Sequence, residues 1–411
     1  MQYSTFAAID IGSYDVILEI FEISKKQGIR SVDKICHRME LGKDTYTLGK
    51  IRPEMEEELC RVLADFVRIM EGYRVDDYRA TASSAISEAS NSLYVLGKIH
   101  QLTGLSVTVL SNSEQRFLSY KALAAMEDNF NKIIEKGTAI LDLDGGSFQI
   151  SLFDKDALVT TQNIRMGSLR IRERLAGIQS ETEHYEEMVE ELIWNEVSSF
   201  KKMYLKDRKI ENIMLIGDVF TDSVYQNIEE KTTKIISREN FNTWYEKIIR
   251  QSPMELAVKL GIPLENASLM YPSAVIYKCL IDMMGAEHIW IPGVHMTRGI
   301  AYEYAEQMKL LKGGHNFEND ILVAARNIAK RYSTGKDHIK GTTDLALAIF
   351  DSMKKVHGMG SRERLLLQIA ALLHDCGKYI SMENVSECSY QIIMSTDIIG
   401  LSSLERQMIA C

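Results

Sequence analysis

The chain has 411 residues, of which 45% are hydrophobic and 26% are charged. This length allows two or three domains with ordinary cores, and the composition is typical of a soluble globular protein. The formal net charge of −9 argues against broad binding of nucleic-acid duplexes, because the phosphate backbone would be repelled. A polyanionic substrate would therefore have to meet a local basic patch.

The first residues form a polar strand and turn pattern, without a basic segment or a long apolar core, so no signal peptide is expected. No run of about 18 apolar residues indicates a membrane span. The six cysteines are scattered and include no C-x-x-C pair, which favours neither a disulfide framework nor a zinc site. We expect a cytoplasmic protein without membrane contact. The sequence is compatible with a monomer or a homodimer.

The stretch FAAIDIGSYDVILEI, residues 6–20, predicts a strand, a tight polar turn and a second strand. Further along, RPEMEEELCRVLADFVRIM places Pro53 at the first position of a helix and acids in its first turn, which are start signals. Helical spacing puts five apolar residues on one face, as expected for a helix packed on a sheet: Leu59, Val62, Leu63, Phe66 and Ile69.

Helix and strand patterns then alternate. YRATASS predicts a strand and a turn, AISEASNSLYVLGKIHQL a helix, LSVTVLS a buried strand and SEQRFLSYKALAAME another helix. Strands separated by helices predict an α/β fold with a largely parallel sheet. From about residue 309, after TRGIAYEYAEQMKLLKGG, the pattern becomes entirely helical.

An internal repeat is the most informative feature. AIDIGSYDVILEIFE has a counterpart in AILDLDGGSFQISLFD, residues 139–154. Each copy has an apolar strand that ends in an aspartate, Asp10 or Asp142, followed by a Gly/Ser turn and a second extended run. The alternation after the second turn is typical of a hairpin. Two such units predict a duplicated fold with two lobes that face a cleft.

The two turns carry groups suited to phosphate chemistry. The carboxylates could bind Mg²⁺ directly or through water. Glycines let backbone N–H groups approach an anion, and the serine hydroxyl adds a donor. A single Asp-x-Gly-Ser turn is as readily a structural hairpin turn. The repeat favours a functional interpretation, in which the two turns face each other and bind a phosphate chain from both sides.

Several segments occur in the order and spacing of the exopolyphosphatase / guanosine pentaphosphate phosphohydrolase (Ppx/GppA) family, which the chain resembles over nearly its whole length. They are AIDIGSYDVILEI, ATASSAISEASN, SVTVLSNSEQRFLSYKAL, AILDLDGGSFQISLFD, NIRMGSLRIRERL, GAEHIWIPGVHMTRGIAYE and LLLQIAALLHDCGKYI. The resemblance implies two ribonuclease-H-like lobes of the actin-like ATPase superfamily, residues 1–125 and 126–308, and a helical HD-type domain, residues 309–411.

The resemblance also implies a function, the removal of terminal phosphates from polyphosphate or pppGpp with Mg²⁺. Glu114 occupies the place of the glutamate that activates water, and Asp10 and Asp142 the places of the metal-binding carboxylates. From the residues alone, Glu114 is a first-turn acid that stabilises its helix by about 0.3–1 kcal/mol. The implied phosphate-binding residues are Gly12, Ser13, Gly145, Gly146, Ser147 and Arg170.

The first turn departs from the family pattern. Where the family has asparagine, serine and arginine, this chain has Tyr14, Asp15 and Ile17. Two neutral donors and a cation are thus replaced by an aromatic ring, an anion and an aliphatic chain. A further arginine of the family is Ser87 here.

The second turn and the segment around Glu114 also depart from the pattern. Asp144 replaces a glycine, Phe148 a threonine and Gln149 a glutamate. Asn112 replaces a glycine two residues before the predicted catalytic residue, and Gln115 replaces a second glutamate.

These changes remove cations and add carboxylates near the predicted site. Asp218 adds a further carboxylate, since it replaces a glycine in a later turn. Two unit charges about 4 Å apart interact by about 4 kcal/mol at an effective dielectric of about 20, so phosphate affinity should suffer. Compensation is the alternative, by a second metal or by arginines that could equally form a solvated helix face: Arg165, Arg170, Arg172, Arg174 and Arg298.

The helical segment keeps the pair His374–Asp375, but the first histidine of an HD metal site aligns with Gly341. Nearby His338 is the alternative. We expect a structural helical domain without a working metal site, because a metal site must be argued from its number of ligands. The sequence ends within LSSLERQMIAC, which reads as an amphipathic helix and predicts a domain that stops early, by natural shortening or by a cut.

Two hypotheses follow. The first is a Mg²⁺-dependent phosphoanhydride hydrolase with Glu114 as its base, whose activity is weakened by the departures. The second is a family member without catalytic activity that binds a nucleotide or a partner protein as a regulator. Replacement of Glu114 by glutamine should strongly lower phosphate release under the first hypothesis, whereas the second predicts little turnover and no response.

Overall fold

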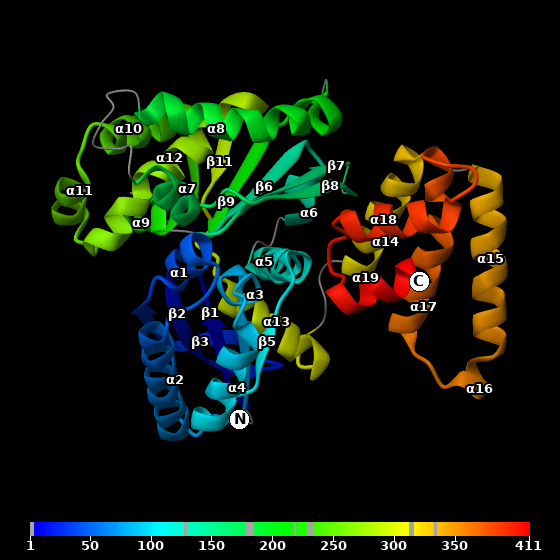
Figure 1. Ribbon diagram of the computed structural model, residues 1–411, viewed down its shortest axis with the longest axis horizontal. Helices are drawn as coiled ribbons and strands as arrows, with labels where there is room; N and C mark the ends of the chain where they lie inside the picture. Colours follow the sequence, from blue (N-terminus) through cyan, green and yellow to red (C-terminus); the bar gives the residue numbers. More distant parts are fainter. Residues whose placement is uncertain are drawn as a thin grey trace.

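A computed structural model of the chain describes residues 4–126, 130–155, 157–176, 185–206, 208–217, 219–227, 234–311, 316–332 and 335–411. Two α/β lobes, each built on one sheet, lie one above the other in Figure 1, and a helical domain lies at their side. This arrangement confirms the predicted fold class.

The first lobe contains a five-stranded sheet in the order β3-β2-β1-β4-β5. Strand β1 is antiparallel to β2 and parallel to β4, and β2 is antiparallel to β3. The strands are β1 (Ser4–Ile11), β2 (Asp15–Ser24), β3 (Gly28–Arg38), β4 (Asp77–Ala82) and β5 (Val107–Val109).

The second lobe contains a six-stranded sheet in the order β10-β11-β9-β6-β7-β8. Strand β6 is antiparallel to β7 and parallel to β9, and β7 is antiparallel to β8. The strands are β6 (Thr138–Leu143), β7 (Phe148–Asp154), β8 (Ala157–Ile164), β9 (Asn212–Gly217), β10 (Ile235–Ser237) and β11 (His288–Trp290).

The two sheets repeat the same unit, which confirms the duplication predicted from sequence. Asp10 pairs with Ile17 across the β1–β2 hairpin, and Asp142 pairs with Gln149 across β6–β7. The prediction of largely parallel sheets is wrong, because five of the nine strand pairs among the described residues are antiparallel. Four of these five pairs are consecutive strands joined by short turns, which can connect only antiparallel strands.

The helices of the first lobe confirm some predictions and correct others. Helix α2 begins at Pro53 as predicted, and four of the five predicted apolar residues are buried. The single helix predicted over AISEASNSLYVLGKIHQL is wrong, since the chain forms two helices there. The helices are α1 (Leu41–Leu48), α2 (Pro53–Gly72), α3 (Ser84–Ser87) and α4 (Ser92–Thr103).

Strand β5 was expected to be buried, and this is wrong: it lies at the edge of the sheet, and Thr108 is exposed. Beyond it, α5 (Asn112–Met126) packs beside α13 (Met296–Gln307). Helix α13 lies within the predicted second-lobe range, but it also packs on β1. Tyr304 of α13 stacks on Phe6 of β1, with ring centroids 4.1 Å apart.

The second lobe surrounds its sheet with helices, and its core is the largest cluster of buried apolar side chains in the described chain. The long helix α12 lies in that core, with Tyr277 almost completely buried. The helical segments are α6 (Phe130–Ile134), α7 (Ser168–Leu175), α8 (Tyr185–Phe200), the π-helical turn η1 (Lys201–Leu205), α9 (Val219–Asn227), α10 (Arg238–Ile249), α11 (Pro253–Leu260) and α12 (Leu264–Met284).

The third part of the chain is helical, as predicted, and packs against the second lobe through α14 and β8. Phe317 of α14 meets Tyr120 of α5 edge-on, with centroids 5.2 Å apart. The segments are α14 (Phe317–Arg331), α15 (Lys336–Ser352), α16 (Lys354–His357), α17 (Ser361–Leu373), the 3-10 turn η2 (Cys376–Tyr379), α18 (Val385–Ser395) and α19 (Ser403–Ala410). Among all described helices, none is long and apolar enough to cross a membrane.

Candidate functional site

A cavity of about 250 Å³ lies between the two lobes, where the repeated turns face each other. We refer to it as the cleft. Asp10, Gly12 and Asp15 line it from the first turn, and Asp142 and Asp144 line it from the second. The structure therefore brings the two aspartates predicted to hold metal into one cavity, together with two of the carboxylates that depart from the family pattern.

The first turn is tightly closed, which explains its glycine. The backbone N–H of Gly12 donates to the carbonyl of Asp15 over 2.8 Å. A Cβ atom on Gly12 would lie only 2.9 Å from the Asp15 Oδ1 atom. The Asp15 side chain thus folds over the backbone position where a phosphate oxygen was predicted to bind.

Four of the predicted phosphate-binding residues are buried and are not among the residues that line the cleft. Ser13 is completely buried and shares a 2.8 Å hydrogen bond with the Tyr46 hydroxyl. A Cβ atom on Gly146 would come within 2.2 Å of that hydroxyl. Gly145 and Ser147 are buried beside them. These residues pack within the turns, whereas Gly12 lines the cleft.

Arg170, also predicted to bind phosphate, makes contacts within the protein. Its Nε donates to the Gly146 carbonyl over 2.9 Å, and its guanidinium lies 3.9 Å from the centroid of the Tyr46 ring. An ion pair of 3.0 Å joins it to Glu88. Arg170 therefore links the second-lobe turn to the first lobe.

The cleft concentrates negative charge. Burial, followed by the nearby Asp15 and Asp144, raises the pKa of Asp10 to about 8. Burial likewise raises the pKa of Asp142 to about 7 and that of Asp144 to about 6. Carboxylates in such surroundings take up protons, or a cation, rather than remain mutually repelling anions.

Cations on β3 that were not predicted from the sequence oppose this charge. Strand register places Arg38 opposite Asp15 and Lys34 opposite Glu19, so their side chains share a face. Both basic residues line the cleft. The Arg38 guanidinium lies 3.5 Å from the Asp15 carboxylate and 5.1 Å from the centroid of the Tyr14 ring. The positive charge missing at Ile17 is thus supplied by the neighbouring strand.

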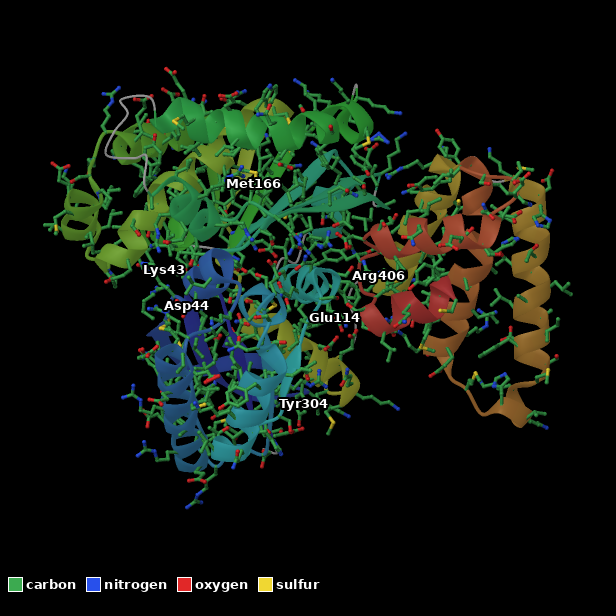
Figure 2. All side chains as sticks on the ribbon, in the orientation of Figure 1. Lys43, Asp44, Glu114, Met166, Tyr304 and Arg406 are labelled. Carbon is green, nitrogen blue, oxygen red and sulfur yellow. The ribbon has the colours of Figure 1, made fainter. Side chains whose placement is uncertain are left out.

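The structure does not bring Glu114 to the cleft. Its Oε2 accepts hydrogen bonds from the Ser111 backbone N–H and hydroxyl, at 2.9 and 2.7 Å. The Glu114 N–H donates back to the same hydroxyl, which completes a capping box. Figure 2 shows Glu114 at the start of α5, where Ser113 bonds to Ile398 of the helical domain. The prediction that Glu114 activates water has no support from this geometry.

The next residue along α5, Gln115, lines the cleft instead. Its buried Nε2 atom has no hydrogen-bond partner among the described residues, and the same holds for Arg38 Nε, Ser83 Oγ and Gln149 Oε1. All four side chains line the cleft. Because buried polar groups are normally paired, these atoms indicate a polar ligand that would complete their hydrogen bonds.

A signal in the sequence could have identified the β3 cations. Lys34, Cys36 and Arg38 alternate at two-residue spacing, which places them on one face of a strand. The strand pairing that turns this face toward the cleft could not be read from that spacing. Asp218, the remaining added carboxylate, lies outside the described residues.

Comparisons with known proteins agree with this architecture. The family model described as "Ppx/GppA phosphatase family" matches residues 20–308, and that described as "Ppx/GppA phosphatase, domain III" matches residues 323–411. A crystal structure of an exopolyphosphatase from Cytophaga hutchinsonii is similar, with a TM-score of 0.66 and 17% identity over 74% of this chain and 98% of that one. The Aquifex aeolicus family member has a TM-score of 0.60 and 16% identity, over 77% of this chain and 100% of that one.

Two curated relatives share sequence with the chain. It is 19% identical to a guanosine-5'-triphosphate,3'-diphosphate pyrophosphatase of Aeromonas hydrophila, over 98% of this chain and 79% of that protein. It is 21% identical to a bifunctional 3-dehydroquinate synthase/phosphatase of Fusobacterium nucleatum, over 69% of this chain and 44% of that protein. The chain thus spans less than half the length of the Fusobacterium relative. Since the first family model alone matches well over half of the chain, this protein belongs to the Ppx/GppA phosphatase family.

Proposed function

We propose that the cleft binds a phosphoanhydride compound, inorganic polyphosphate or pppGpp, together with Mg²⁺, and that hydrolysis there is slow. The observation that carries this proposal is the set of buried polar atoms without a described partner on four residues that line the cleft with the carboxylates: Arg38, Ser83, Gln115 and Gln149. The names of two relatives, an exopolyphosphatase and a guanosine-5'-triphosphate,3'-diphosphate pyrophosphatase, support the choice of ligands.

The residues of the cleft fit Mg²⁺. Asp10 and Asp142 offer only oxygen ligands, which this ion prefers, and it commonly binds through one or two carboxylates, waters and substrate phosphates. The raised pKa values of both carboxyls are those of groups that a cation would stabilise as anions. When bound, the ion would neutralise charge on the phosphate chain.

The donors would bind the phosphoryl oxygens. Arg38 offers a charged N–H at Nε, and Ser83 and Gln115 offer a hydroxyl and an amide. Lys34 extends the basic strip along β3. A chain of phosphates could therefore lie along β3, with its terminal phosphoryl group near the two turns.

Slow hydrolysis follows from the side chains that face this position. Gln115 is a neutral amide and cannot accept a proton as a general base. The Glu114 carboxylate is held in its capping box. Asp15 is paired with Arg38, and Asp144 accepts a 2.7 Å hydrogen bond from the Gly145 N–H. Asp222 also lines the cleft and lies 3.6 Å from His295 Nε2. Each described carboxylate that lines the cleft thus has a protein partner or is assigned to the proposed metal.

A second candidate function is regulatory binding without any turnover. Gln115 favours it, because a site that retains its ligand uncleaved can report ligand concentration to a partner protein. The two candidates share the cleft and differ only in whether phosphate is released.

Calorimetry with polyphosphate, pppGpp and ATP, each with and without MgCl₂, should be paired with a phosphate-release assay. We expect Mg²⁺-dependent binding of polyphosphate or pppGpp, release far slower than in an active family member, and no effect of E114Q on release. Absence of binding to both compounds would refute the proposal. Loss of release in E114Q would restore the first sequence-based hypothesis, and zero release with tight binding would select the regulatory function.

A further inference from the structure

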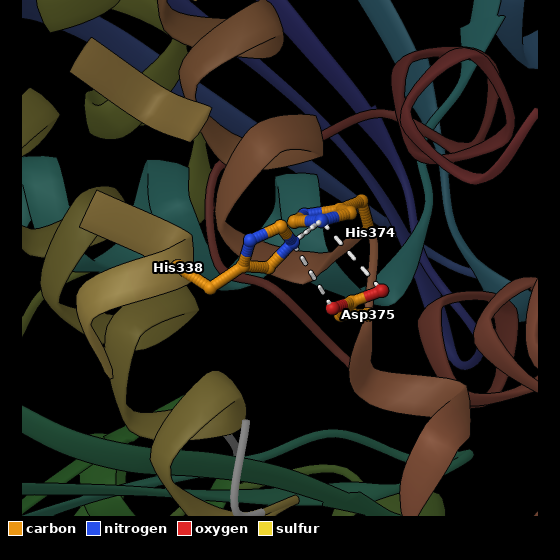
Figure 3. Close-up of side chains that lie close together, drawn as sticks. All are labelled: His338, His374 and Asp375. Carbon is orange, nitrogen blue, oxygen red and sulfur yellow. Dashed lines mark hydrogen bonds and ion pairs between the residues drawn. The ribbon is translucent and has the colours of Figure 1, made fainter. Parts of the chain in front are cut away.

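Two histidines and an aspartate meet in the helical domain, far along the chain from the cleft residues. Figure 3 shows His338 of α15 facing His374 and Asp375, which lie between α17 and η2. The two Nε2 atoms are 3.2 Å apart. Asp375 Oδ2 lies 3.4 Å from His338 Nε2, and Asp375 Oδ1 lies 3.6 Å from His374 Nε2.

Among the described residues, this is the one group of three His, Cys, Asp or Glu side chains whose candidate ligand atoms all lie within 4.8 Å of one another. Gly341, the position at which the resemblance placed a first histidine, lies almost one helical turn further along α15 and has no side chain to offer. The structure brings in His338 instead.

The hydrogen bonding of His374 orients its ring for a cation. Its Nδ1 lies 2.8 Å from the Ala371 carbonyl, and a carbonyl can only accept, so Nδ1 carries the proton. In the neutral ring Nε2 then presents a lone pair to His338 and Asp375. A second ring nitrogen donating to a backbone carbonyl is the usual arrangement of a metal-bound histidine.

The two Nε2 atoms are close enough for His338 to donate a proton to the His374 lone pair, or for one cation to replace that proton. Asp375 places one carboxylate oxygen 3.4 Å from His338 Nε2 and the other 3.6 Å from His374 Nε2. One carboxylate and two imidazoles are then directed at one point.

The backbone around His374 and Asp375 is bonded to α18. Ser389 of α18 donates to the His374 carbonyl over 2.9 Å and accepts from the Gly377 N–H over 2.9 Å. A Cβ atom on Gly377 would lie 2.1 Å from the Val385 carbonyl oxygen, so α18 packs directly on this turn. By contrast, the His338 side chain is 60% exposed, which leaves the group open to solvent on one side.

We propose that His338, His374 and Asp375 bind a divalent transition-metal ion such as Zn²⁺, with water at the remaining position. Two imidazole nitrogens and one carboxylate are borderline ligands that favour Zn²⁺, Mn²⁺ or Fe²⁺ over Mg²⁺. This second metal site is separate from the cleft and does not depend on the function proposed for it.

The test is calorimetric titration of chelator-treated full chain with Zn²⁺, and with Co²⁺ to record its visible absorption. We expect one tight site per chain in the wild type, weakened at least 100-fold in H338A and in H374A. His338 is mostly exposed, so H338A should fold even if H374A does not. H288A, which removes an exposed histidine of the second lobe, and the cleft variant D10N should bind Zn²⁺ as the wild type does.

Several outcomes would overturn the proposal. One is no Zn²⁺ binding, and another is binding that H338A leaves unchanged. A third is a Co²⁺ spectrum identical in the wild type and in H338A, which would place the ion elsewhere. Failure of polyphosphate binding in the cleft would leave the Zn²⁺ result as it stands, because the two sites are tested by different ligands.

Discussion

The cleft and the His338–His374–Asp375 group differ in how completely the protein provides a metal site. The cleft draws its carboxylates from two turns in different lobes, and no three of its described acidic or histidine ligand atoms come within 4.8 Å of one another. The helical group places three ligand atoms within that distance on neighbouring helical segments. The proposed Mg²⁺ site in the cleft needs a phosphate ligand to complete it. The His338–His374–Asp375 group has its three ligand atoms together before any ion binds.

This difference follows from the chemistry of the ligands. Oxygen-only sites for Mg²⁺ retain water and share the ion with phosphate. Imidazole sites select metals through nitrogen ligands held by second contacts, as His374 is by Ala371. The protein ligands of a metal-dependent phosphate site can therefore be widely spaced, whereas those of a transition-metal site are held close together in advance. Each of the following predictions tests one side of this contrast.

The largest effect is expected from Q115E. It would place a carboxylate on the α5 position that lines the cleft, and a positioned general base typically contributes about 10²–10⁴-fold. We expect phosphate release from polyphosphate or pppGpp to rise by about 10²-fold or more with MgCl₂. Q115N is the matched control, since it shortens the side chain without adding a base. A rate in Q115E equal to that of Q115N would show that the missing base does not limit turnover.

D142N should separate the two metal sites. It removes one of the two proposed oxygen ligands in the cleft, so we expect Mg²⁺-dependent ligand binding to weaken by about 100-fold, the upper range for one charged contact. Zn²⁺ binding by the helical domain should not change. Calorimetry with both metals on the same preparation measures this, and a parallel loss of Zn²⁺ binding would contradict the independence of the sites.

Replacement of Arg38 tests the basic strip on β3. R38M removes a partly buried guanidinium that lines the cleft. We expect polyphosphate affinity to fall about 10- to 100-fold, as for a lost charge-assisted hydrogen bond of about 1.5–3 kcal/mol. R30M is the control on the same strand, because Arg30 pairs with Glu22 and is mostly exposed. Equal affinity in R38M and the wild type would place the ligand elsewhere.

The cleft carboxylates predict how stability depends on pH. Because the pKa of Asp10 rises to about 8 and that of Asp142 to about 7 on folding, the native state binds protons that the unfolded state has released. Their contribution to stability is complete below the unfolded pKa of about 3.8 and is lost as pH rises toward 7–8. Thermal unfolding without divalent metal should give a Tm that falls over this range.

Mg²⁺ should restore stability most at pH 8, where these carboxylates have lost their protons. D10N should flatten the pH dependence, because an amide does not titrate. A Tm of wild-type protein that rises from pH 5 to pH 8 in parallel with that of D10N would contradict the assignment.

The smallest effect is expected from E114Q. Because a glutamine can still accept the Ser111 hydrogen bonds of the capping box, the loss should be about 0.5 kcal/mol in the free energy of unfolding and negligible in phosphate release. Chemical denaturation and the release assay measure the two quantities. E114A should cost about 1 kcal/mol in the free energy of unfolding. A release rate that falls in E114Q and falls further in E114A would reveal a catalytic role.

Local sequence patterns were sufficient for much of the fold. Pro53 and the apolar face of α2 predicted a helix that the structure contains, because capping and periodicity act within a few residues. The repeated Asp-turn hairpins predicted two lobes and a shared cleft. The parallel sheets and the buried β5 were wrong, because strand partners and edges depend on contacts distant in sequence.

The candidate site divides in the same way. The identities of Asp10 and Asp142, and the excess of carboxylates around them, could be read from the sequence because the chain repeats them. Which neighbouring side chain enters the cleft, Glu114 or Gln115, was decided by one step of about 100° around α5. That rotation is set by the capping box and by packing against the helical domain.

The sequence by itself determined the family, the duplicated turns and the chemical types available for a phosphate site. Only the tertiary structure decided that β3 returns positive charge to the cleft through Arg38, and that His338 reaches His374 and Asp375 across two helices. The physical reason is range: turns and caps depend on adjacent residues, whereas charge balance and metal ligation depend on side chains that only folding brings within a few ångströms of one another.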